Sequence, residues 1–536
     1  MRRALPALLA SCLAASPALA ETVPATPADY QQKLATLQPG DTLALAGGDY
    51  LNGMNLFDLN GAPGSPIVIE GPASGAPARF LAKSGKNTID IRRASFVTIR
   101  NLVLDGQGVP VDAIKAGGQA TDWAHHITIE GCRITGHDNS QQTVGISTKI
   151  VAWDWIVRGN VIAGAGTGAY FGNSDGTRAF IGGLIEHNLF ADTLGYNMQI
   201  KYQLHRQQAD VPSVPTDDRV AIIRHNVFIK NDKPSPDGAR PNVLVDGPPS
   251  SGPGSGDRAE IYGNFFFHNP GDALFQGNGR LHIHDNVLVD SAHAAIRLAN
   301  HDGKTVIDAL VYNNTIYATQ TGISFGSAPS GASFVRGNAI FSPSPFNATV
   351  TGQTDNVTDS VANAGNYVGA PSTVLGQMDF FPKAGGGLKG SAIDLSPVSS
   401  GSDHDRDFNG TLKDGTFRGA YHGEGQNPGW SPDSTLKSGG ASGGAGSGGQ
   451  GPGSGGAASG GVAGGGLAGS TSGGATGTGA ASSGGGSGGS GAAASSGDDD
   501  GGCGCRVSST RERHPAWLLL GALLLARRRR AAIRSR

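Results

Sequence analysis

The chain has 536 residues, of which 86 are glycine, and its formal net charge is −2. That near-neutrality hides two basic ends, because residues 1–20 and 506–536 hold eleven of the 41 basic residues and leave an acidic stretch between them. An acidic body argues against nucleic-acid binding, and four cysteines are too few for a disulfide scaffold.

The N-terminal 20 residues have the layout of an export signal. Arg2 and Arg3 precede an apolar stretch, and Ala18-Leu19-Ala20 forms a small-residue cleavage site before Glu21. We therefore predict a signal peptide over 1–20, with a buried N-terminal helix as the alternative. The run that ends at Cys12 also resembles a bacterial lipobox, so lipidation of Cys12 stays open.

A repeated phrase organises residues 21–425. Each copy has a β-rich run, a bend and a second apolar run, and copies recur every 22–38 residues. Helical periodicity is confined to 29–37, while 126–130, 221–224 and 281–284 alternate as short strands do. Asparagine occupies the bend in most copies, and Cys132 takes its place in one. The bend asparagines are Asn101, Asn160, Asn188, Asn226, Asn264, Asn286, Asn314 and Asn338.

An asparagine at each bend can adopt left-handed geometry, and stacked asparagine side chains can form a hydrogen-bonded ladder. The pattern resembles the right-handed parallel β-helix of the pectate-lyase-like superfamily, and residues 37–43 and 48–50 resemble the N-terminal cap of that family. The resemblance implies an all-β solenoid in which each coil packs on its neighbours. A sandwich or a propeller is the alternative. Cys132 is expected to be a small buried side chain.

The strand after each bend indicates which residues face outward. We expect one side to point into the core and the neighbouring position to point out. The expected inward residues are Ile114, Ile146, Phe171, Ile200, Val245, Phe275, Ile296 and Ile323, and the expected outward residues are Lys115, Ser147, Gly172, Lys201, Asp246, Gln276, Arg297 and Ser324. In this alignment Lys201 neighbours Asp246, and Gln276 neighbours Arg297, because stacked coils lie about 4.8 Å apart.

The two longest repeats bracket Lys201, and long loops on a rigid scaffold often carry function. Removal of the C5 proton of a uronic acid needs a base and a cation that stabilises the developing negative charge. The candidate catalytic residues are Lys201, Arg240, Asp246 and Arg297, and the candidate substrate-binding residues are His205, Gln276 and His293. An outward, solvated ladder of salt bridges is the alternative interpretation.

Family signatures narrow the activity. The sequence lacks the paired-aspartate signature of polygalacturonases and the signatures of the main pectate lyases, whereas residues 199–202 resemble the lysine-bearing strand of the alginate lyase and chondroitinase B group. That group continues with Arg-His-Gly in the next coil, where this chain has Val245-Asp246-Gly247, so the expected proton donor is absent. Asp246 with Asp272 is a weaker, hydrolase-type alternative.

No metal ligands are predicted at the site. His293, Arg297 and His301 form a polar group without the spacing of a metal motif. Calcium is considered only for residues 403–410, whose acidic residues can instead form the closing segment that commonly follows a β-helix.

The C-terminal part has the composition of a tether followed by a sorting signal. We predict a disordered linker over 426–502, where 30 of the 65 residues from 438 to 502 are glycine. Segment 503–536 holds Cys503, Cys505, an apolar run at 516–526 that is too short to span a bilayer, and an arginine cluster at 527–530. This order resembles the MYXO-CTERM sorting signal, which implies processing near Cys503 or Cys505. An unprocessed anchor is the alternative.

The sequence thus predicts an exported, surface-tethered or secreted monomer whose β-helix binds an extracellular polysaccharide that contains uronic acids. Whether it also cleaves the polysaccharide stays open, with lyase-type elimination favoured over hydrolysis. Its partners are the polysaccharide and, through the tail, the membrane of the cell envelope; no cofactor is assigned and no nucleic acid is expected. The alternative function is a non-catalytic carbohydrate-binding or adhesion module.

Overall fold

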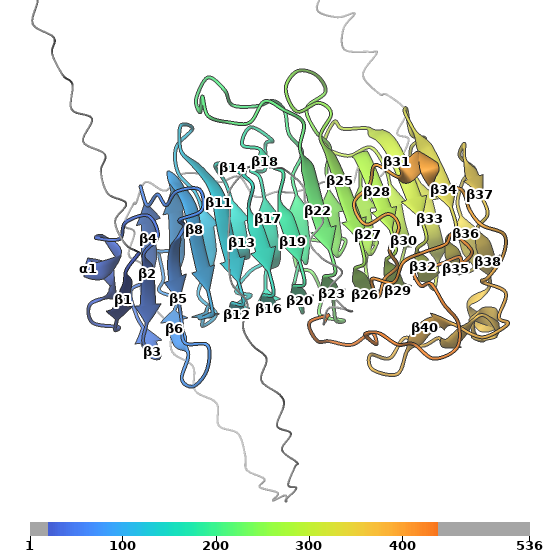
Figure 1. Ribbon diagram of the computed structural model, residues 1–536, viewed down its shortest axis with the longest axis horizontal. Coiled ribbons are helices and arrows are strands. Elements are labelled where there is room, and N and C mark those ends of the chain that lie inside the picture. The colour runs from blue at the N-terminus through green and yellow to red at the C-terminus, as the bar shows by residue number, and fades with distance from the viewer. Residues whose placement is uncertain (1–19, 438–536) are drawn as a thin grey trace, which may run out of the picture. The chain divides into compact units, whose positions relative to one another are not determined.

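The computed structural model describes residues 20–437, which belong to one compact unit. The predicted signal peptide except Ala20, most of the predicted linker, Cys503 and Cys505 lie outside the described residues. Successive strands run side by side in three parallel sheets (Figure 1). The parallel β-helix expected from the sequence is therefore confirmed. Within residues 20–437, no helix has the length and apolar character needed to cross a bilayer.

Sheet A contains the strand that precedes each bend. Its main path is β1 (Thr22–Ala25), β2 (Thr42–Leu45), β5 (Ile67–Glu70), β8 (Ala94–Arg100), β11 (Trp123–Glu130), β15 (Ile156–Arg158), β19 (Leu184–Glu186), β22 (Val220–Arg224), β25 (Arg258–Tyr262), β28 (Gly279–His284), β31 (Val306–Tyr312), β34 (Ser333–Arg336) and β37 (Gln353–Thr354). Two short strands, β14 (Val151–Trp153) and β18 (Phe180–Ile181), extend it beside β11.

Sheet B follows the bend. Its strands are β3 (Gly48–Tyr50), β6 (Ala78–Leu81), β9 (Leu102–Asp105), β12 (Arg133–His137), β16 (Val161–Ala165), β20 (Leu189–Ala191), β23 (Val227–Ile229), β26 (Phe265–Asn269), β29 (Val287–Ser291), β32 (Thr315–Tyr317), β35 (Ala339–Phe341) and β38 (Val357–Asp359).

Sheet C completes each coil and leads back to sheet A. Its strands are β4 (Met54–Phe57), β7 (Ile89–Arg92), β10 (Ile114–Ala116), β13 (Val144–Thr148), β17 (Thr167–Phe171), β21 (Met198–Ile200), β24 (Val243–Val245), β27 (Phe275–Gly277), β30 (Ala294–Leu298), β33 (Thr321–Phe325) and β36 (Ser344–Phe346). All eight residues expected to point inward from this sheet are buried.

The asparagine ladder runs through the bend between sheets A and B. From Asn160 to Asn338, the backbone N–H of each rung donates to the side-chain oxygen of the asparagine in the next coil, at 2.9–3.1 Å. Cys132 is buried at the N-terminal end of the ladder and donates its backbone N–H to Asn160 at 2.9 Å. The five expected central members, Asn188, Asn226, Asn264, Asn286 and Asn314, all take part.

Two details of the bend differ from the expectation. The left-handed residue is not the ladder asparagine but the residue before it, such as His187 at φ 53° or Gly263 at φ 64°. Asn101 itself has φ 58°, so it occupies this left-handed position, and Leu102 takes the ladder position. A left-handed residue turns the chain sharply, which frees the next side chain to point inward and bond along the stack.

An alternating row of charges follows the outer face of sheet A. Paired positions in β5, β8, β11, β15, β19 and β22 carry glutamate and arginine in turn. Ion pairs link neighbouring rungs, for example Arg224 to Glu186 at 2.8 Å. We call this row the charge ladder; its members are Glu70, Arg100, Glu130, Arg158, Glu186 and Arg224.

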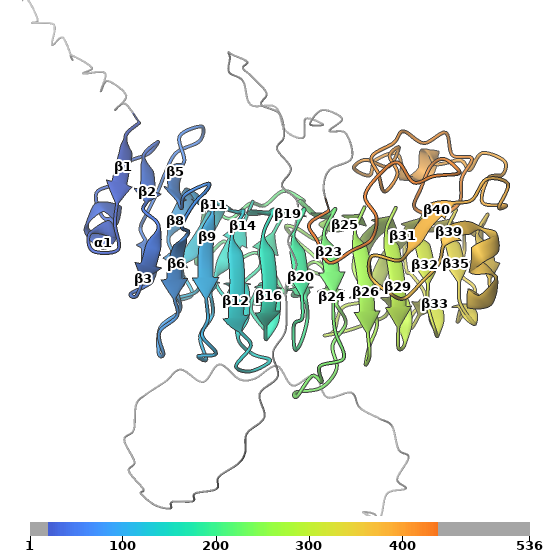
Figure 2. The ribbon, with the colours of Figure 1, turned by 90° about the horizontal axis from the view of Figure 1, so that it is seen from below.

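The last described segment, 361–437, folds back on the solenoid. It includes the 3-10 helices η1 (Val361–Asn366) and η2 (Ser396–Val398) and the antiparallel pair β39 (Val368–Ala370) and β40 (Asp379–Pro382). The ribbon of this segment lies over the C-terminal half of the solenoid (Figure 2). Its apolar side chains, among them Phe380 and Phe408, pack on the outward residues of β20, β23, β26, β29 and β35. Lys437 is buried and donates to the carbonyls of Gly263 and Phe408, so the ordered body includes residues beyond the expected boundary at 425.

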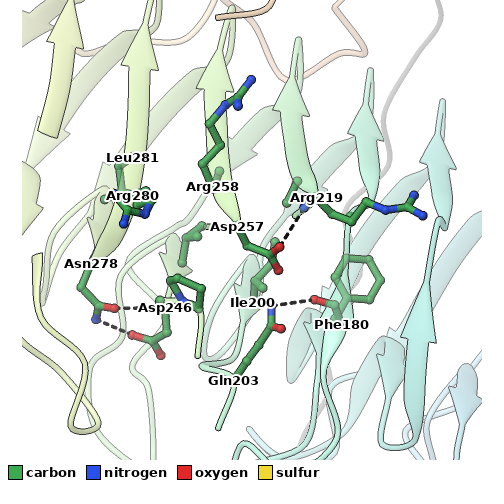
Figure 3. A pocket seen from close by; sticks show the side chains of 16 residues that line it. Phe180, Ile200, Gln203, Arg219, Asp246, Asp257, Arg258, Asn278, Arg280 and Leu281 are labelled. Atoms are coloured by element: carbon green, nitrogen blue, oxygen red, sulfur yellow. Dashed lines mark hydrogen bonds between the residues drawn. The ribbon is translucent and has the colours of Figure 1, made fainter. Parts of the chain in front are cut away.

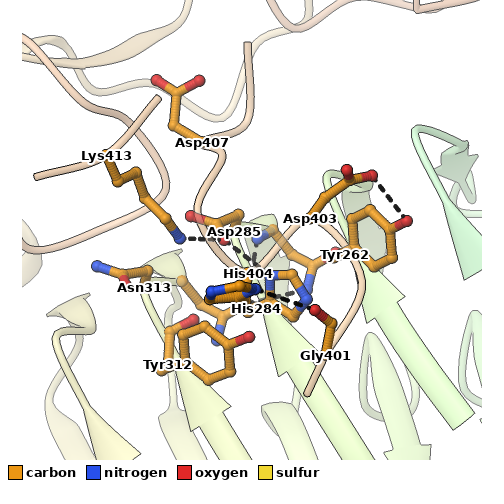
Figure 4. A network of polar contacts seen from close by, with 12 residues as sticks. Tyr262, His284, Asp285, Tyr312, Asn313, Gly401, Asp403, His404, Asp407 and Lys413 are labelled. Atoms are coloured by element: carbon orange, nitrogen blue, oxygen red, sulfur yellow. Dashed lines mark hydrogen bonds and ion pairs between the residues drawn. The ribbon is translucent and has the colours of Figure 1, made fainter. Parts of the chain in front are cut away.

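Polar contacts attach the same segment to sheet A (Figure 4). Tyr262, His284 and Tyr312 stack along the sheet with ring centroids 4.8 and 4.6 Å apart. Lys413 bonds Asp285 at 2.6 Å, and Asp403 accepts from the Tyr262 hydroxyl at 3.0 Å.

Residues 403–410 form part of this closing segment. Asp407 accepts from the backbone N–H groups of Asn409, Thr411 and His422. Asp403 and Asp407 thus bond to protein donors, as in a closing segment.

The one α-helix within residues 20–437, α1 (Tyr30–Leu34), lies at the N-terminal end of the solenoid within the expected 29–37. Tyr30 packs edge-on against Tyr50 and Phe80, so the first coil is capped by aromatic rings. The ends of a solenoid need such covers because an uncapped coil would expose its core.

Candidate functional site

The outer face of sheet C carries the expected column of polar residues. At two places, however, the pairing of neighbouring strands is shifted by two residues from the expected alignment. Ser147 pairs with Tyr170, and Leu244 pairs with Gln276. Lys201 and Asp246 directly follow the paired residues Ile200 and Val245, so they are neighbours as expected. Gln276 and Arg297 are also neighbours. They pair with Leu244, however, so their row lies two residues before the row of Lys201 and Asp246 along the strands. Strand length differs between coils, which an alignment based only on alternation does not detect.

A compact polar cluster forms where β21, β24, β27 and β30 end. Lys201 makes an ion pair with Asp302, and its side chain is only 3% exposed. Asp246 accepts from Asn278 Nδ2 at 2.8 Å, and Asn278 accepts in turn from the Gly247 N–H at 2.7 Å (Figure 3). We call Lys201, Asp246, Asn278, His301 and Asp302 the edge cluster. Each coil contributes to it from the same end of its strand.

A tight turn brings in the last two members. His301 and Lys304 exchange backbone hydrogen bonds at 3.0 and 2.9 Å, and between them Asp302 and Gly303 both have positive φ, 49° and 72°. This is a type I′ hairpin turn, for which Asp-Gly is a preferred pair. It places His301 Nδ1 3.1 Å from Asp246 Oδ1 and 3.5 Å from Asp302 Oδ2.

The sequence does not single out Asp302, and it places His301 in a polar group that lacks the spacing of a metal motif. The available signal was the Asp-Gly pair of an I′ turn directly after the strand that contains Arg297. The carboxylates come from two different coils, so no spacing within one segment could reveal the cluster.

Two long loops flank the cluster, one following β21 over 201–219 and one following β24 over 246–257 (Figure 1, green). Arg206 of the first loop makes an ion pair with Asp257 of the second at 2.7 Å, and both side chains are buried. Such a buried pair fixes the loops relative to each other, because breaking it would leave a charge without compensation.

A small crevice beside Asp246 lies between the ends of sheet C and the start of sheet A (Figure 3). Gln203, Asp257 and Asn278 are among its polar lining residues. The crevice is large enough to hold a water molecule between these polar groups. On the other side of Asp246, the side chains of His301 and Asp302 are 20% and 25% exposed.

Several expected site residues lie away from the edge cluster. Arg240 precedes β24 whereas Asp246 follows it, and the Arg240 guanidinium donates to the carbonyls of Ala239 and Asp237. His293 precedes β30, at the opposite end from His301, and is exposed. The expected grouping of Arg240 with Lys201 is wrong because the chain crosses the sheet between them.

The remaining expected site residues also lie outside the edge cluster. His205 is exposed in the loop after β21. Arg297 is exposed on the outer face of β30, where it pairs with the buried Gln276 of β27. Asp272 precedes β27, so it lies at the other end of the strands from Asp246. The structure therefore does not form the hydrolase pair of Asp246 with Asp272.

A second buried lysine, Lys230, lies where sheet B leads into sheet C, at the end of the sheet C strands opposite the edge cluster. Lys230 follows β23 and donates to the carbonyl of Arg240 at 3.2 Å. Burial lowers its pKa to about 8. At the edge cluster, burial also lowers the pKa of Lys304, against the opposing effect of Asp246.

Comparison with known proteins gives architecture only. No family model matches the chain, and no curated protein matches its sequence. Solved structures similar to it include a GH136 lacto-N-biosidase from Eubacterium ramulus, with 10% identity, a TM-score of 0.41 and coverage of 63% of this chain and 68% of that chain.

Two other similar structures are a mannuronic acid specific lyase and a mannuronan epimerase. A mannuronic acid specific family 6 polysaccharide lyase from human gut microbiota has 15% identity, a TM-score of 0.36 and coverage of 63% and 83%. The A-module of a mannuronan C-5 epimerase from Azotobacter vinelandii has 17% identity, a TM-score of 0.35 and coverage of 62% and 94%. At these identities and TM-scores, the structural likeness supports no statement about the function of this chain.

Proposed function

We propose that the β-helix acts on an extracellular polysaccharide that contains uronic acids, with Lys201 as the base of a β-elimination. The observation that supports this is the convergence of Lys201, Asp246, His301 and Asp302 at one edge of sheet C, between two loops that are tied together. From β20 to β35 the outward face of sheet B is packed under segment 361–437, whereas the ends of the sheet C strands are not part of that core.

The proposed chemistry needs a rearrangement at Lys201. A lysine acts as a base only in its neutral form, which burial favours and a neighbouring carboxylate opposes. The substrate would therefore have to separate Lys201 from Asp302 before proton removal. Asp302 is on a two-residue turn with a partly exposed side chain, so it is the partner that can move.

The Lys201–Asp302 pair also supports a second candidate, a non-catalytic carbohydrate-binding or adhesion module. In that case the pair is a structural salt bridge, and the exposed residues of the neighbouring rungs, such as Arg297, contact the ligand. The two candidates differ in whether Lys201 is needed for product formation.

The experiment is an ultraviolet absorbance screen of the full-length protein against polyuronates, because each elimination creates an absorbing unsaturated uronate. On a responsive polymer, Lys201→Ala should lower kcat/KM at least about 10²-fold. Lys33→Ala is the matched control, since Lys33 also makes a lysine–aspartate pair, with Asp29 at 2.6 Å, but lies in α1.

Full activity in Lys201→Ala would move the base elsewhere. Retention of a polyuronate in affinity electrophoresis without any product would instead support the binding module.

We also propose that the body is displayed on the cell surface through the C-terminal segment. This rests on the order of tether, Cys503, Cys505, apolar run and arginine cluster in the sequence.

A further inference from the structure

Three side chains of the edge cluster present possible metal ligands to one point. One oxygen of Asp246, one ring nitrogen of His301 and one oxygen of Asp302 lie within 4.8 Å of one another. Among residues 20–437, this is the one group of three histidine, cysteine or acidic residues with such spacing. A cation that bound all three would need only small movements of these side chains.

A second observation points to a ligand here. The side chain of Asp246 is 0% exposed, yet its Oδ2 has no hydrogen-bond partner in the protein, while Oδ1 accepts from both Asn278 and His301. A buried carboxylate oxygen without a partner is costly, because nothing replaces the water that it lost. A bound cation would remove that cost.

The fold holds the three ligands by different means. Asp246 is fixed by its position after β24 and by the bond from Asn278, whose own oxygen is fixed by the Gly247 N–H. His301 and Asp302 are held by the I′ turn. Partners that orient ligand side chains in this way strengthen metal sites.

We propose that Asp246, His301 and Asp302 bind a divalent first-row transition cation, of the Zn²⁺ or Mn²⁺ type. One imidazole and two carboxylates are the donors that these ions accept, whereas Ca²⁺ takes six to eight oxygens. The proposal concerns the same place as the proposed function but does not depend on it, because cation binding is measured without polysaccharide.

Two lysines determine how tightly the cation binds. Lys201 already pairs with Asp302, and Lys304 lies close enough to Asp246 to feel its charge. The cation therefore competes with Lys201 for Asp302, and replacing Lys201 by an uncharged residue of similar length should strengthen binding.

The test is a Mn²⁺ titration of the full-length, metal-stripped protein, followed by electron paramagnetic resonance of the free ion. Mn²⁺ prefers oxygen to thiolate ligands, so it discriminates against Cys503 and Cys505. Wild type should bind one ion per chain. Asp246→Asn and His301→Ala should each weaken binding at least about tenfold, and Lys201→Met should strengthen it. His293→Ala is the matched control, because His293 is an exposed histidine just before β30, at the opposite end of that strand from His301, and should leave the affinity for Mn²⁺ unchanged.

Other results would overturn the proposal. Binding that is unchanged in His301→Ala would place the ion elsewhere, for example at the acidic run 498–500 of the tail. No binding by wild type, or displacement of Mn²⁺ by equal concentrations of Ca²⁺, would also refute it. His301 is partly exposed, so its variant should fold even if Asp246→Asn does not.

Discussion

Single buried asparagines connect one coil to the next. The side chain of Asn264 accepts from the Asn226 N–H at 2.9 Å and donates to the Ile223 carbonyl at 2.8 Å and to Asn286 Oδ1 at 3.0 Å. A ladder of this kind satisfies the backbone groups that each bend would otherwise leave unpaired inside the protein.

We expect Asn264→Leu to lower the free energy of unfolding by about 1–3 kcal/mol for each buried group that it leaves unpaired. Urea unfolding followed by circular dichroism measures this loss. Asn52→Leu serves as the control, because Asn52 is exposed and its replacement should change stability by less than about 0.5 kcal/mol. Equal midpoints for the two variants would contradict a stabilising ladder.

His268 gives the fold a pH-dependent contact. A hydrogen bond with Asp290 at 2.7 Å, and a second with Asp232 at 3.0 Å, raise the pKa of His268 above 6.5. The folded state therefore holds the proton more tightly than the unfolded chain. The resulting stabilisation is complete below the unfolded pKa and is lost as the pH rises through the folded pKa.

His268→Asn tests this dependence, since asparagine tolerates the left-handed backbone, φ 56°, at this position. Wild type should exceed the variant by up to about 1 kcal/mol near pH 6, and the gap should close towards about pH 9. Unfolding curves over this range measure it. A gap that widens with pH would show that the histidine is neutral in the folded state.

At the scale of elements, segment 361–437 completes a second hydrophobic core outside the coil. Phe380 of β40 is fully buried and packs against Tyr317 of β32 with ring centroids 5.6 Å apart. Sheet B alone would leave apolar side chains such as Phe265 and Val287 in water, so this segment is an integral part of the domain.

Phe380→Ala should destabilise the protein by about 3–5 kcal/mol, because it removes a buried ring and leaves a cavity. The urea midpoint reports the change. Phe57→Ala, at a phenylalanine that is 37% exposed on β4, should have a much smaller effect. If both variants unfold alike, segment 361–437 does not stabilise sheet B.

The strands and the ladder could be predicted from the sequence because each coil repeats the same local signals. Alternation around Ile200 and Ile296 correctly identified the inward face, and the asparagines marked the bends. The residue that turns the chain was placed one position too late, since glycine, histidine and aspartate share that position and leave no single pattern.

The candidate site was only partly predictable, for a geometric reason. Lys201 and Asp246 follow neighbouring strands and were found by counting, whereas Asp302 lies 101 residues from its partner Lys201 and enters through a turn. Arg240 and His293 were grouped with Lys201 because position along the strand direction was ignored. Which end of a strand a residue occupies decides its neighbours as much as which face it occupies.

At the scale of the whole molecule, we expect the tail to direct export and processing. If it is a sorting signal, the chain extracted from the cell surface ends before Arg536. Replacing Cys503 and Cys505 by alanine should then leave an unprocessed, mislocalised form. Intact mass spectrometry of the surface-extracted protein distinguishes the two. A mature wild-type chain that still ends at Arg536 would rule out processing.

The charge ladder restricts how such a solenoid can change length. Because glutamate and arginine alternate from Glu70 to Arg224, loss of the single coil that carries Glu130 would bring Arg100 beside Arg158. Loss of two consecutive coils would restore opposite neighbours. Like charges directly opposite on adjacent strands are destabilising. In this half of the solenoid, loss or gain of a single coil should therefore cost up to about 1 kcal/mol more than loss or gain of a pair of coils, so parity as well as length should affect the stability of shortened or duplicated forms.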